Sequence, residues 1–259
     1  MSTARESTKE HWQRFWSDGR QLEDVYSNGD RLLAVATAAR DLKGCRTLEV
    51  GAGTGRDTLA LIERGATGYV VDYTFEALGL TRKAALAAGR TVNLVCADAR
   101  ALPFRDDSFG LVFHQGLLEH FRDPRPLLRE NARITRSGGR VLVDVPQTWH
   151  LYTLMKNGLI LVNRWFAGWE TQFTVDELER LVRDSGLEVV RSYGDWMVPG
   201  LWYRVVREVL KRGTGARLPL DPRGPAWWSN GWERWRGWLR RRRWALNTCH
   251  VIGTVGRRR

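Results

Sequence analysis

The sequence predicts an α/β protein with a parallel sheet that is covered by helices on both faces. Short apolar runs that indicate buried strands alternate with stretches that indicate helices along most of the 259 residues. Glycines such as Gly65, Gly89 and Gly186 follow the helical stretches, where glycine is typical of a helix end. Strands and helices that alternate at this spacing favour a parallel sheet, so we expect a ligand beyond the carboxyl ends of the strands.

The expected elements follow one another in a regular order. Two helices, over residues 9–17 and 31–42, precede the first strand, and the first of them carries Trp12 and Trp16 one turn apart. Buried strands are expected over residues 47–50, 69–72, 92–96, 109–113, 140–145, 187–191 and 249–255. The intervening helices are expected to begin near Leu59, to cover 74–88, to run from Asp123-Pro124 to Ser137, and to run from the Thr174 capping box to Gly186.

Two segments fall outside this alternation, residues 149–173 after the fifth strand and residues 196–244 before the last strand. Both follow the carboxyl end of a strand, and we therefore expect them to form a cap over the ligand pocket. The whole chain, 1–259, is expected to be one domain, with N-terminal helices in 1–45 and a ligand-binding core in 46–148.

Composition limits the cellular setting. Residues 2–20 are polar and do not resemble a signal peptide, and the most apolar stretch, 151–166, is too short and too polar to cross a bilayer. Cys45, Cys96 and Cys249 are odd in number and widely spaced, which argues against a disulfide framework and against a zinc site. We expect a cytoplasmic protein without a metal.

The most informative stretch is TLEVGAGTG, residues 47–55, a strand followed by a glycine turn and the start of a helix. Glycines let a ligand approach the backbone closely, and the first helical turn offers unpaired amides. The dinucleotide fingerprint G-x-G-x-x-G would need its third glycine at position 56, which is Arg56. The acid Glu49 instead precedes the glycines by two residues, so the turn predicts a different nucleoside ligand.

Two further acids lie at expected strand ends. Asp72 follows Gly55 by 17 residues, and a carboxylate there can accept both hydroxyls of a ribose that lies over the glycine turn. Asp98 is placed to accept a proton from an adenine amino group, and Tyr73 can lie against the ring. Each carboxylate taken alone is better explained as a solvated strand end or a helix cap.

Taken together, these residues resemble the class I S-adenosylmethionine-dependent methyltransferases. The resemblance is to the type 11-like branch that includes quinone-biosynthesis and many small-molecule methyltransferases, and it covers about residues 46–191. It implies seven strands in the order 3-2-1-4-5-7-6, with the last strand antiparallel. The matching positions are Glu49, Gly51, Ala52, Gly53, Thr54, Gly55, Asp72, Ala97, Asp98, Ala99, Leu102, Pro103, Phe104, Phe109, Val112, Leu118, Glu119, His120, Arg133, Gly138 and Gly139.

The resemblance also implies a role for several residues. Glu49 with Gly51, Ala52, Gly53 and Gly55 would hold the methionine part of S-adenosyl-L-methionine, and Asp72 the ribose. Asp98 and the Ala99 amide would read the adenine, and Gln115 would lie beside the sulfonium. The product would be S-adenosyl-L-homocysteine.

The implied reaction is transfer of a methyl group to an oxygen, nitrogen or carbon nucleophile, for which alignment and exclusion of water matter most. A general base is optional. Imidazole titrates near neutral pH, so the candidate bases are His114, His120 and His150, although a histidine can equally be a packing or loop residue.

The formal net charge of +12 is confined to one end of the chain. Residues 200–259 hold 15 of the 41 basic and 3 of the 29 acidic residues, together with seven of the 13 tryptophans. Two amphipathic helices are expected within residues 201–243, and such helices suit an anionic membrane surface. Packing of the tryptophans on the sheet is an equally good explanation, and nucleic acid is a weaker one because no RNA-binding module is present.

Three functions therefore remain. The first is methyl transfer to a small, apolar or lipid-linked acceptor by a soluble or peripherally attached enzyme. The second is an RNA methyltransferase that uses the basic C-terminal segment. The third is a non-catalytic protein that binds S-adenosylmethionine, which the glycine turn and the two acids do not distinguish from an enzyme.

Overall fold

The structure is a computed structural model, and it describes residues 8–17, 29–39, 41–165, 167–216, 218–219, 226–239 and 242–259. At residues 29, 30, 212, 226–230 and 233 only the backbone is described. Arg240 and Arg241, which the sequence places in the basic end of the chain, lie outside the described residues. The same holds for the side chains of Trp227 and Trp228.

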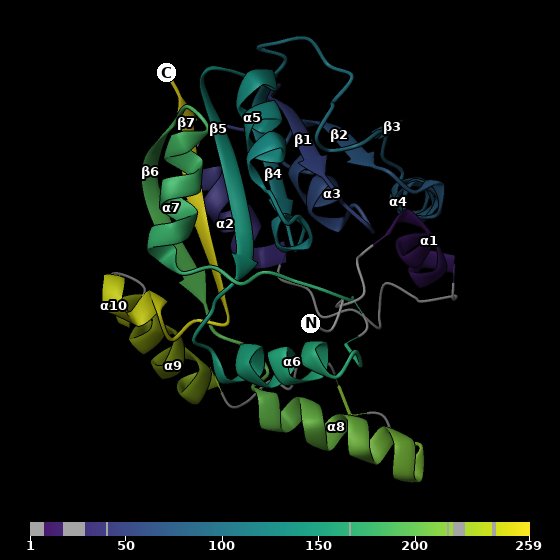
Figure 1. The fold of residues 1–259 in the computed structure, drawn as a ribbon, viewed down its shortest axis with the longest axis vertical. Helices are drawn as coiled ribbons and strands as arrows, with labels where there is room; N and C mark the ends of the chain where they lie inside the picture. The colour runs from purple at the N-terminus through teal and green to yellow at the C-terminus, as the bar shows by residue number, and fades with distance from the viewer. Residues whose placement is uncertain are drawn as a thin grey trace.

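Seven strands form one sheet in the order β3-β2-β1-β4-β5-β7-β6 (Figure 1). The first five pair in parallel, whereas β7 runs antiparallel to both β5 and β6. The predicted fold class and strand order are therefore confirmed. The strands are β1 Arg46–Val50, β2 Thr67–Asp72, β3 Asn93–Cys96, β4 Phe109–Gln115, β5 Thr135–Pro146, β6 Leu187–Asp195 and β7 Val251–Arg258.

Helices cover both faces of the sheet, because strand side chains alternate between two apolar clusters. Leu128 of α5 and Leu178 of α7 pack with Val112 on one face. Leu32 of α2 and Leu61 of α3 pack with Phe113 on the other. The helices are α1 Lys9–Ser17, α2 Gly29–Ala39, α3 Arg56–Ile62, α4 Phe75–Ala87, α5 Arg125–Ile134, α6 Leu151–Leu161, α7 Val175–Asp184, α8 Leu201–Thr214, α9 Ala226–Leu239 and α10 Arg243–Leu246, with a short 3₁₀ turn at Leu118–His120.

Several predicted boundaries are wrong by a few residues: the helix expected over 31–42 is Gly29–Ala39, and the strands expected over 140–145, 187–191 and 249–255 are Thr135–Pro146, Leu187–Asp195 and Val251–Arg258. The helix expected to reach Ser137 ends at Ile134, and β5 begins at Thr135, which pairs with Phe109. Arg258 of β7 donates hydrogen bonds of 2.8 Å to the carbonyl oxygens of Ala132 and Thr135. A guanidinium from the last strand thus satisfies the end of α5, where orphan carbonyls need a partner.

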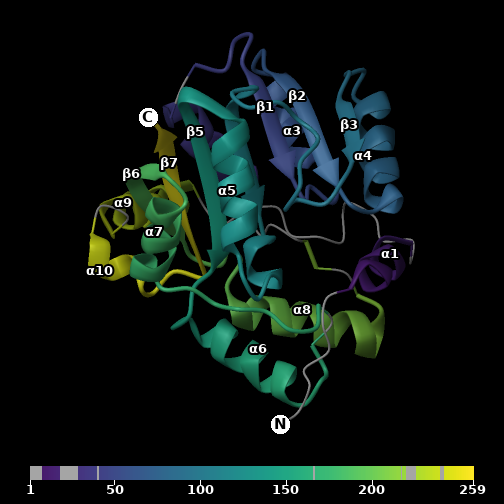
Figure 2. The same cartoon turned by 45° about the horizontal axis from the view of Figure 1, so that its top comes forward.

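The two segments outside the alternation lie beyond the carboxyl ends of β5 and β6. α6 and α8 occupy the same side of the molecule in both views, below the sheet (Figures 1 and 2). No helix in the described part of the chain is long and apolar enough to cross a membrane.

Part of the basic C-terminal end is used inside the protein. Arg236 of α9 is buried and pairs with Asp195 at the end of β6. Arg243 of α10 pairs with Asp176 at 2.5 Å and with Glu179 at 2.8 Å. These two arginines of the basic C-terminal end therefore form ion pairs within the protein.

We expect Gly253→Ala to destabilise the fold. A Cβ on Gly253 of β7 would collide with the carboxylate of Asp144 and with the ring of Tyr193, which donates a hydrogen bond to that carboxylate. Overpacking of this kind lowers the free energy of unfolding by about 1–3 kcal/mol, measurable in urea. Gly79→Ala in α4 is the matched control, since its Cβ would meet no atom within 4 Å. Equal stability of the two variants would contradict the prediction.

Candidate functional site

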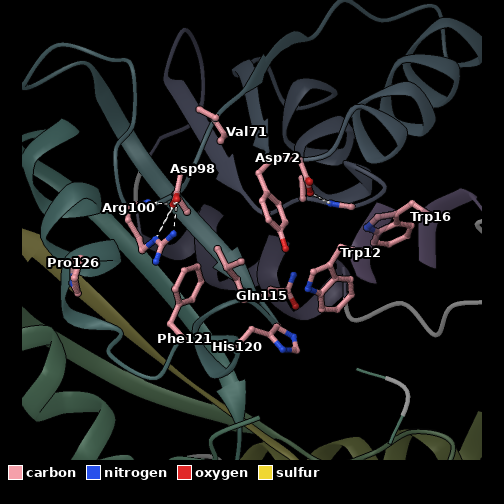
Figure 3. Close-up of a pocket in the computed structure, with 18 of the residues that line it drawn as sticks. Trp12, Trp16, Val71, Asp72, Asp98, Arg100, Gln115, His120, Phe121 and Pro126 are labelled. Carbon is pink, nitrogen blue, oxygen red and sulfur yellow. Dashed lines mark hydrogen bonds and ion pairs between the residues drawn. The ribbon is translucent and has the colours of Figure 1, made fainter. Parts of the chain in front are cut away.

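A cavity of about 630 Å³ lies at the carboxyl ends of β1, β2 and β4 (Figure 3). Most of the residues that the sequence nominated line it. These are Gly51, Ala52, Gly53, Asp72, Tyr73, Asp98, Ala99, Gln115 and His120. Glu49, Gly55, His114 and His150 do not belong to the lining.

The glycine turn after β1 forms one wall of the cavity. Gly51, Gly53 and Gly55 adopt φ values of 66°, 54° and 64°, a region that side chains other than glycine rarely adopt. A Cβ on Gly51 would lie 2.6 Å from Leu117, and one on Gly53 would lie 2.6 Å from Trp16. Glycine is therefore required here both for backbone conformation and for space.

Asp72, the last residue of β2, ties this turn to the neighbouring strand. Its Oδ2 accepts a 3.3 Å hydrogen bond from the Gly53 amide, and its Oδ1 accepts bonds of 2.9 and 2.8 Å from the amide and hydroxyl of Thr74. Burial raises the pKa of Asp72, while these hydrogen bonds act in the opposite direction. The carboxylate is thus fixed at the cavity wall with its orientation set by three donors.

Glu49 lies behind the turn. Its Oε2 accepts bonds from the Thr58 amide at 3.0 Å and the Thr58 hydroxyl at 2.6 Å, in the first turn of α3. Burial, with the nearby charge of Asp57, raises the pKa of Glu49 to about 8. One amide that we expected to be unpaired is therefore already satisfied, and Glu49 supports the glycine turn from below.

Asp98 is held by its neighbour Arg100. The guanidinium donates to both carboxylate oxygens, with a shortest distance of 2.6 Å, and lowers the pKa of Asp98. The same guanidinium lies 5.7 Å from the ring centroid of Phe121, across the cavity wall. Asp98, Arg100 and Phe121 come together at this end of the cavity (Figure 3).

Gln115, at the end of β4, is held from two sides. Arg31 of α2 donates to its Oε1 at 3.1 Å, and its Nε2 donates to Asp57 at 2.6 Å. Arg31 also pairs at 2.6 Å with Asp144, which is buried in β5. This network couples the second N-terminal helix to the cavity wall.

The three candidate bases have different surroundings. His114 is completely buried in β4, has no hydrogen-bond partner among the described residues, and has its pKa lowered to about 3 by burial. His150 caps α6 and accepts the Tyr152 amide at 3.2 Å. His120 is the one of the three that lines the cavity.

His120 is fixed between the first helix and the segment after α6. Its ring lies 4.9 Å from the Trp12 ring, edge to face, and it hydrogen-bonds the backbone of Trp169. Burial lowers the pKa of His120 to about 4, and the charge of Glu170 acts in the opposite direction. The imidazole is therefore neutral at pH 7.

A buried charged cluster lies behind His120. Lys156 of α6 donates to Glu170 at 2.5 Å, and the Trp165 indole donates to the other oxygen of Glu170 at 2.6 Å. The Thr171 amide donates to the Glu119 carbonyl at 2.8 Å. These bonds fasten the segment after α6 to the turn that carries His120.

The lining residues that were not nominated from the sequence include four aromatic and two basic side chains. Trp12, Trp16 and Trp169 all line the cavity, although they come from outside the core 46–148. The spacing of Trp12 and Trp16 was the one signal available for two of them. The remaining lining residues not nominated are Thr54, Val71, Ala97, Arg100, Gly116, Leu117, Phe121, Arg122, Asp123 and Pro126.

The arrangement fits S-adenosylmethionine. The glycine turn offers a cradle that a Cβ would fill, Asp72 presents a fixed carboxylate at the neighbouring strand end, and aromatic rings close the opposite side. In the described part of the chain no group of three or more His, Cys, Asp or Glu could hold a metal ion.

Glu119 gives a pH-dependent prediction. This acid is buried, and burial together with the charge of Glu170 raises its pKa to about 8 from 4.5. The folded protein therefore keeps a proton that the unfolded chain releases, so the free energy of unfolding falls as the pH rises from about 4.5 to 8. Between pH 5 and 8.5, we expect the free energy of unfolding to fall less in Glu119→Gln than in wild type, by on the order of 1 kcal/mol.

Urea unfolding at both pH values measures this difference. Glu188→Gln is the control, because Arg257 lowers the pKa of Glu188 and removes it from that pH window. The same pH dependence in wild type and Glu119→Gln would contradict the prediction.

Sequence comparisons agree with this geometry. The family model described as a methyltransferase domain matches residues 48–143. Demethylmenaquinone methyltransferase of Clavibacter sepedonicus is 38% identical over 116 residues, which cover 44% of this chain and 47% of the relative. That of Mycobacterium bovis (strain BCG / Pasteur 1173P2) is 37% identical over 110 residues, 42% of this chain and 44% of the relative. The matches thus span about half the length of these curated relatives.

Solved structures match over more of the chain. An S-adenosylmethionine-dependent methyltransferase of Thermotoga maritima has a TM-score of 0.60 at 17% identity and covers 96% of this chain and 99% of its own. Magnesium protoporphyrin IX methyltransferase of Synechocystis, solved with S-adenosylhomocysteine, has a TM-score of 0.54 at 19% identity and covers 71% and 85%. These likenesses concern the fold. Residues 48–143 thus match a methyltransferase domain, and the chain has the fold of the class I S-adenosylmethionine-dependent methyltransferases.

Proposed function

We propose that this protein transfers a methyl group from S-adenosylmethionine to an oxygen, nitrogen or carbon atom of a small, apolar or lipid-linked acceptor. The observation that carries the proposal is the cavity itself. It joins the glycine turn and Asp72 on one side to His120 and several aromatic rings on the other. A donor and an acceptor would thus meet inside one walled space.

In this proposal the cofactor contacts follow the strand ends. Gly51, Ala52, Gly53 and Gly55 shape the cradle for the methionine part, and Glu49 holds that cradle through Thr58. Asp72 accepts the ribose hydroxyls. Asp98 and the Ala99 amide bind the adenine edge, with Tyr73 beside it and Gln115 toward the sulfonium. S-adenosylmethionine, when bound, supplies a methyl group on a sulfonium that needs no further activation.

The protein's own task is then to align, to shield and to take up a proton. Trp16 lies over Gly53, and Trp12 lies against His120, so α1 covers the cavity beside the glycine turn. Exclusion of water and a fixed geometry account for much of the rate in such transfers. We propose residues 149–173, which supply Trp169, as the cap at the acceptor end.

We propose His120 as the general base, where the acceptor requires one. It lines the cavity as a neutral imidazole at pH 7, the form that can accept a proton. The proton that an acceptor hydroxyl or ring carbon releases would pass to this ring, and the nearby charge of Glu170 would stabilise the resulting imidazolium. His114 and His150 lie outside the lining, which disfavours both as bases.

The acceptor is proposed to be flat and apolar. Trp12, Phe121 and Trp169 supply aromatic walls, and the guanidinium of Arg122 lies 4.6 Å from the Trp169 ring centroid. The similarity to demethylmenaquinone methyltransferases over half their length agrees with a ring that carries an apolar tail. We propose that the protein works in the cytoplasm, at a membrane surface where such acceptors reside.

Neither alternative gains an observation of its own. An RNA methyltransferase would need its basic residues directed at phosphates, but Arg236, Arg243 and Arg257 form ion pairs within the protein. A non-catalytic binding protein would share the glycine turn and Asp72. It differs in one measurable respect, because it would never release S-adenosylhomocysteine.

The first test concerns the cofactor. Asp72→Asn keeps the shape of the side chain but removes the charge that would face the ribose, and a hydrogen bond to a charged group contributes about 1.5–3 kcal/mol. We expect S-adenosylhomocysteine to bind roughly 10- to 100-fold more weakly by calorimetry. Asp106→Asn is the control, since Asp106 lies outside the lining and pairs with Arg133. Undiminished binding by Asp72→Asn would refute the ribose role.

The second test concerns catalysis. Release of S-adenosylhomocysteine is measured with a short-chain demethylmenaquinone, reduced in the assay, as the probe acceptor. We expect turnover in wild type and a 10²- to 10⁴-fold lower kcat in His120→Ala, the range typical of a lost general base. His150→Ala is the control and should retain turnover within about twofold. Full activity of His120→Ala would exclude it as the base.

A further inference from the structure

α8 turns its apolar stripe away from the protein. Trp202, Val205, Val206 and Val209 recur at helical spacing on one face, and all four are exposed, Trp202 by 76% and Val209 by 63%. An amphipathic helix of a globular protein normally buries such a stripe against the core. In α8 the apolar stripe instead faces away from the core.

α6 shows the same reversal. Its lysine, Lys156, is only 2% exposed because it pairs with Glu170 inside the protein. Leu151, Leu154 and Met155 occupy the outward face and are exposed, as is Leu161 at its end. Burying a charge while exposing leucines is unfavourable in water, so this face needs an apolar partner.

α6 and α8 lie on the same side of the molecule. They lie below the sheet in both views, and Arg204 of α8 is near enough to influence the pKa of Tyr152 of α6 (Figures 1 and 2). The segment that contains α6 also supplies Trp169 to the cavity. The apolar side is therefore adjacent to the acceptor end of the site.

Positive charge accompanies this side. α8 contains four basic residues and one acidic residue, Glu208. Arg204 donates to the carbonyl oxygens of Pro199 and Val198, and Arg207 donates to that of Leu218, bonds that orient the guanidinium groups. Apolar side chains with flanking cations match the interface of an anionic bilayer.

We propose that the outward faces of α6 and α8 form a docking surface for an anionic lipid bilayer, and that α9 does not. The inference deepens the proposed function, because a lipid-linked acceptor would then be delivered beside the cavity. α9 is a weaker candidate because Arg236 and Leu239 bury one of its faces against the protein, although Trp232, Trp235 and Trp238 are about as exposed as Val205 and Val206. If two copies of the chain met through this docking surface, the cations of α8 in one copy would face those in the other. Charge repulsion therefore favours lipid over self-association.

Flotation with vesicles tests the proposal. The probes are phosphatidylglycerol–phosphatidylcholine vesicles, with pure phosphatidylcholine as the neutral reference. We expect wild type to float with the anionic vesicles, and Val206→Asp/Val209→Asp to lose at least about tenfold in partitioning. Val190→Asp is the matched control, because Val190 is an exposed valine of β6 outside this side of the molecule. Its flotation should equal that of wild type.

Three results would overturn the proposal. One is wild-type protein that stays unbound on anionic vesicles at low salt. Another is loss of flotation in Trp235→Asp but not in Val206→Asp/Val209→Asp, which would assign binding to α9. The third is a wild-type dimer that the double variant converts to a monomer without any vesicle binding. Affinity for S-adenosylhomocysteine, measured in parallel, should be the same in wild type and in every variant. If wild type does not bind S-adenosylhomocysteine at all, the proposed function is refuted instead.

Discussion

The hydrogen bond between the Gly53 amide and the buried Asp72 carboxylate is the constraint on which the cavity depends. It joins the turn after β1 to the end of β2, and Thr74 fixes the other carboxylate oxygen. Glu49 lies behind the turn and accepts hydrogen bonds from the amide and the hydroxyl of Thr58 in α3. Two buried acids thus hold one glycine turn, and their desolvation is offset by donors that belong to that turn and its neighbours.

The fold and the part of the cavity lining that lies at the strand ends could be predicted because their signals are local. Asp72 and Gln115 lie at strand ends, and the carboxyl ends of parallel strands necessarily meet at one edge. The boundary of α5 could not be predicted in this way. Carbonyl oxygens at its end accept hydrogen bonds from Arg258, more than 100 residues later, and no local pattern indicates that contact.

The rest of the cavity lining was predicted less well because it depends on contacts between distant parts of the chain. His114 and His120 are six residues apart and equally plausible as bases in sequence, yet β4 turns His114 into the core while the 3₁₀ turn brings His120 to the cavity. The pairing of Lys156 with Glu170, and of Arg31 with Asp144, links separate elements. Cations in such pairs contribute little to the charge of the protein surface. Which cations are paired in this way depends on the folded structure and is not indicated by the sequence.

The insertion between β6 and β7 begins and ends on neighbouring antiparallel strands. Asp195 pairs with Val251, and the His250 amide donates to the Asp195 carbonyl at 2.9 Å. Strand pairing therefore holds the two ends of the insertion next to each other, independently of the residues between them. Since loop-closure entropy grows only slowly with length, evolution can lengthen, shorten or exchange this stretch at little thermodynamic expense. Replacement of this one insertion could therefore change the surface to which the protein binds without disturbing the sheet.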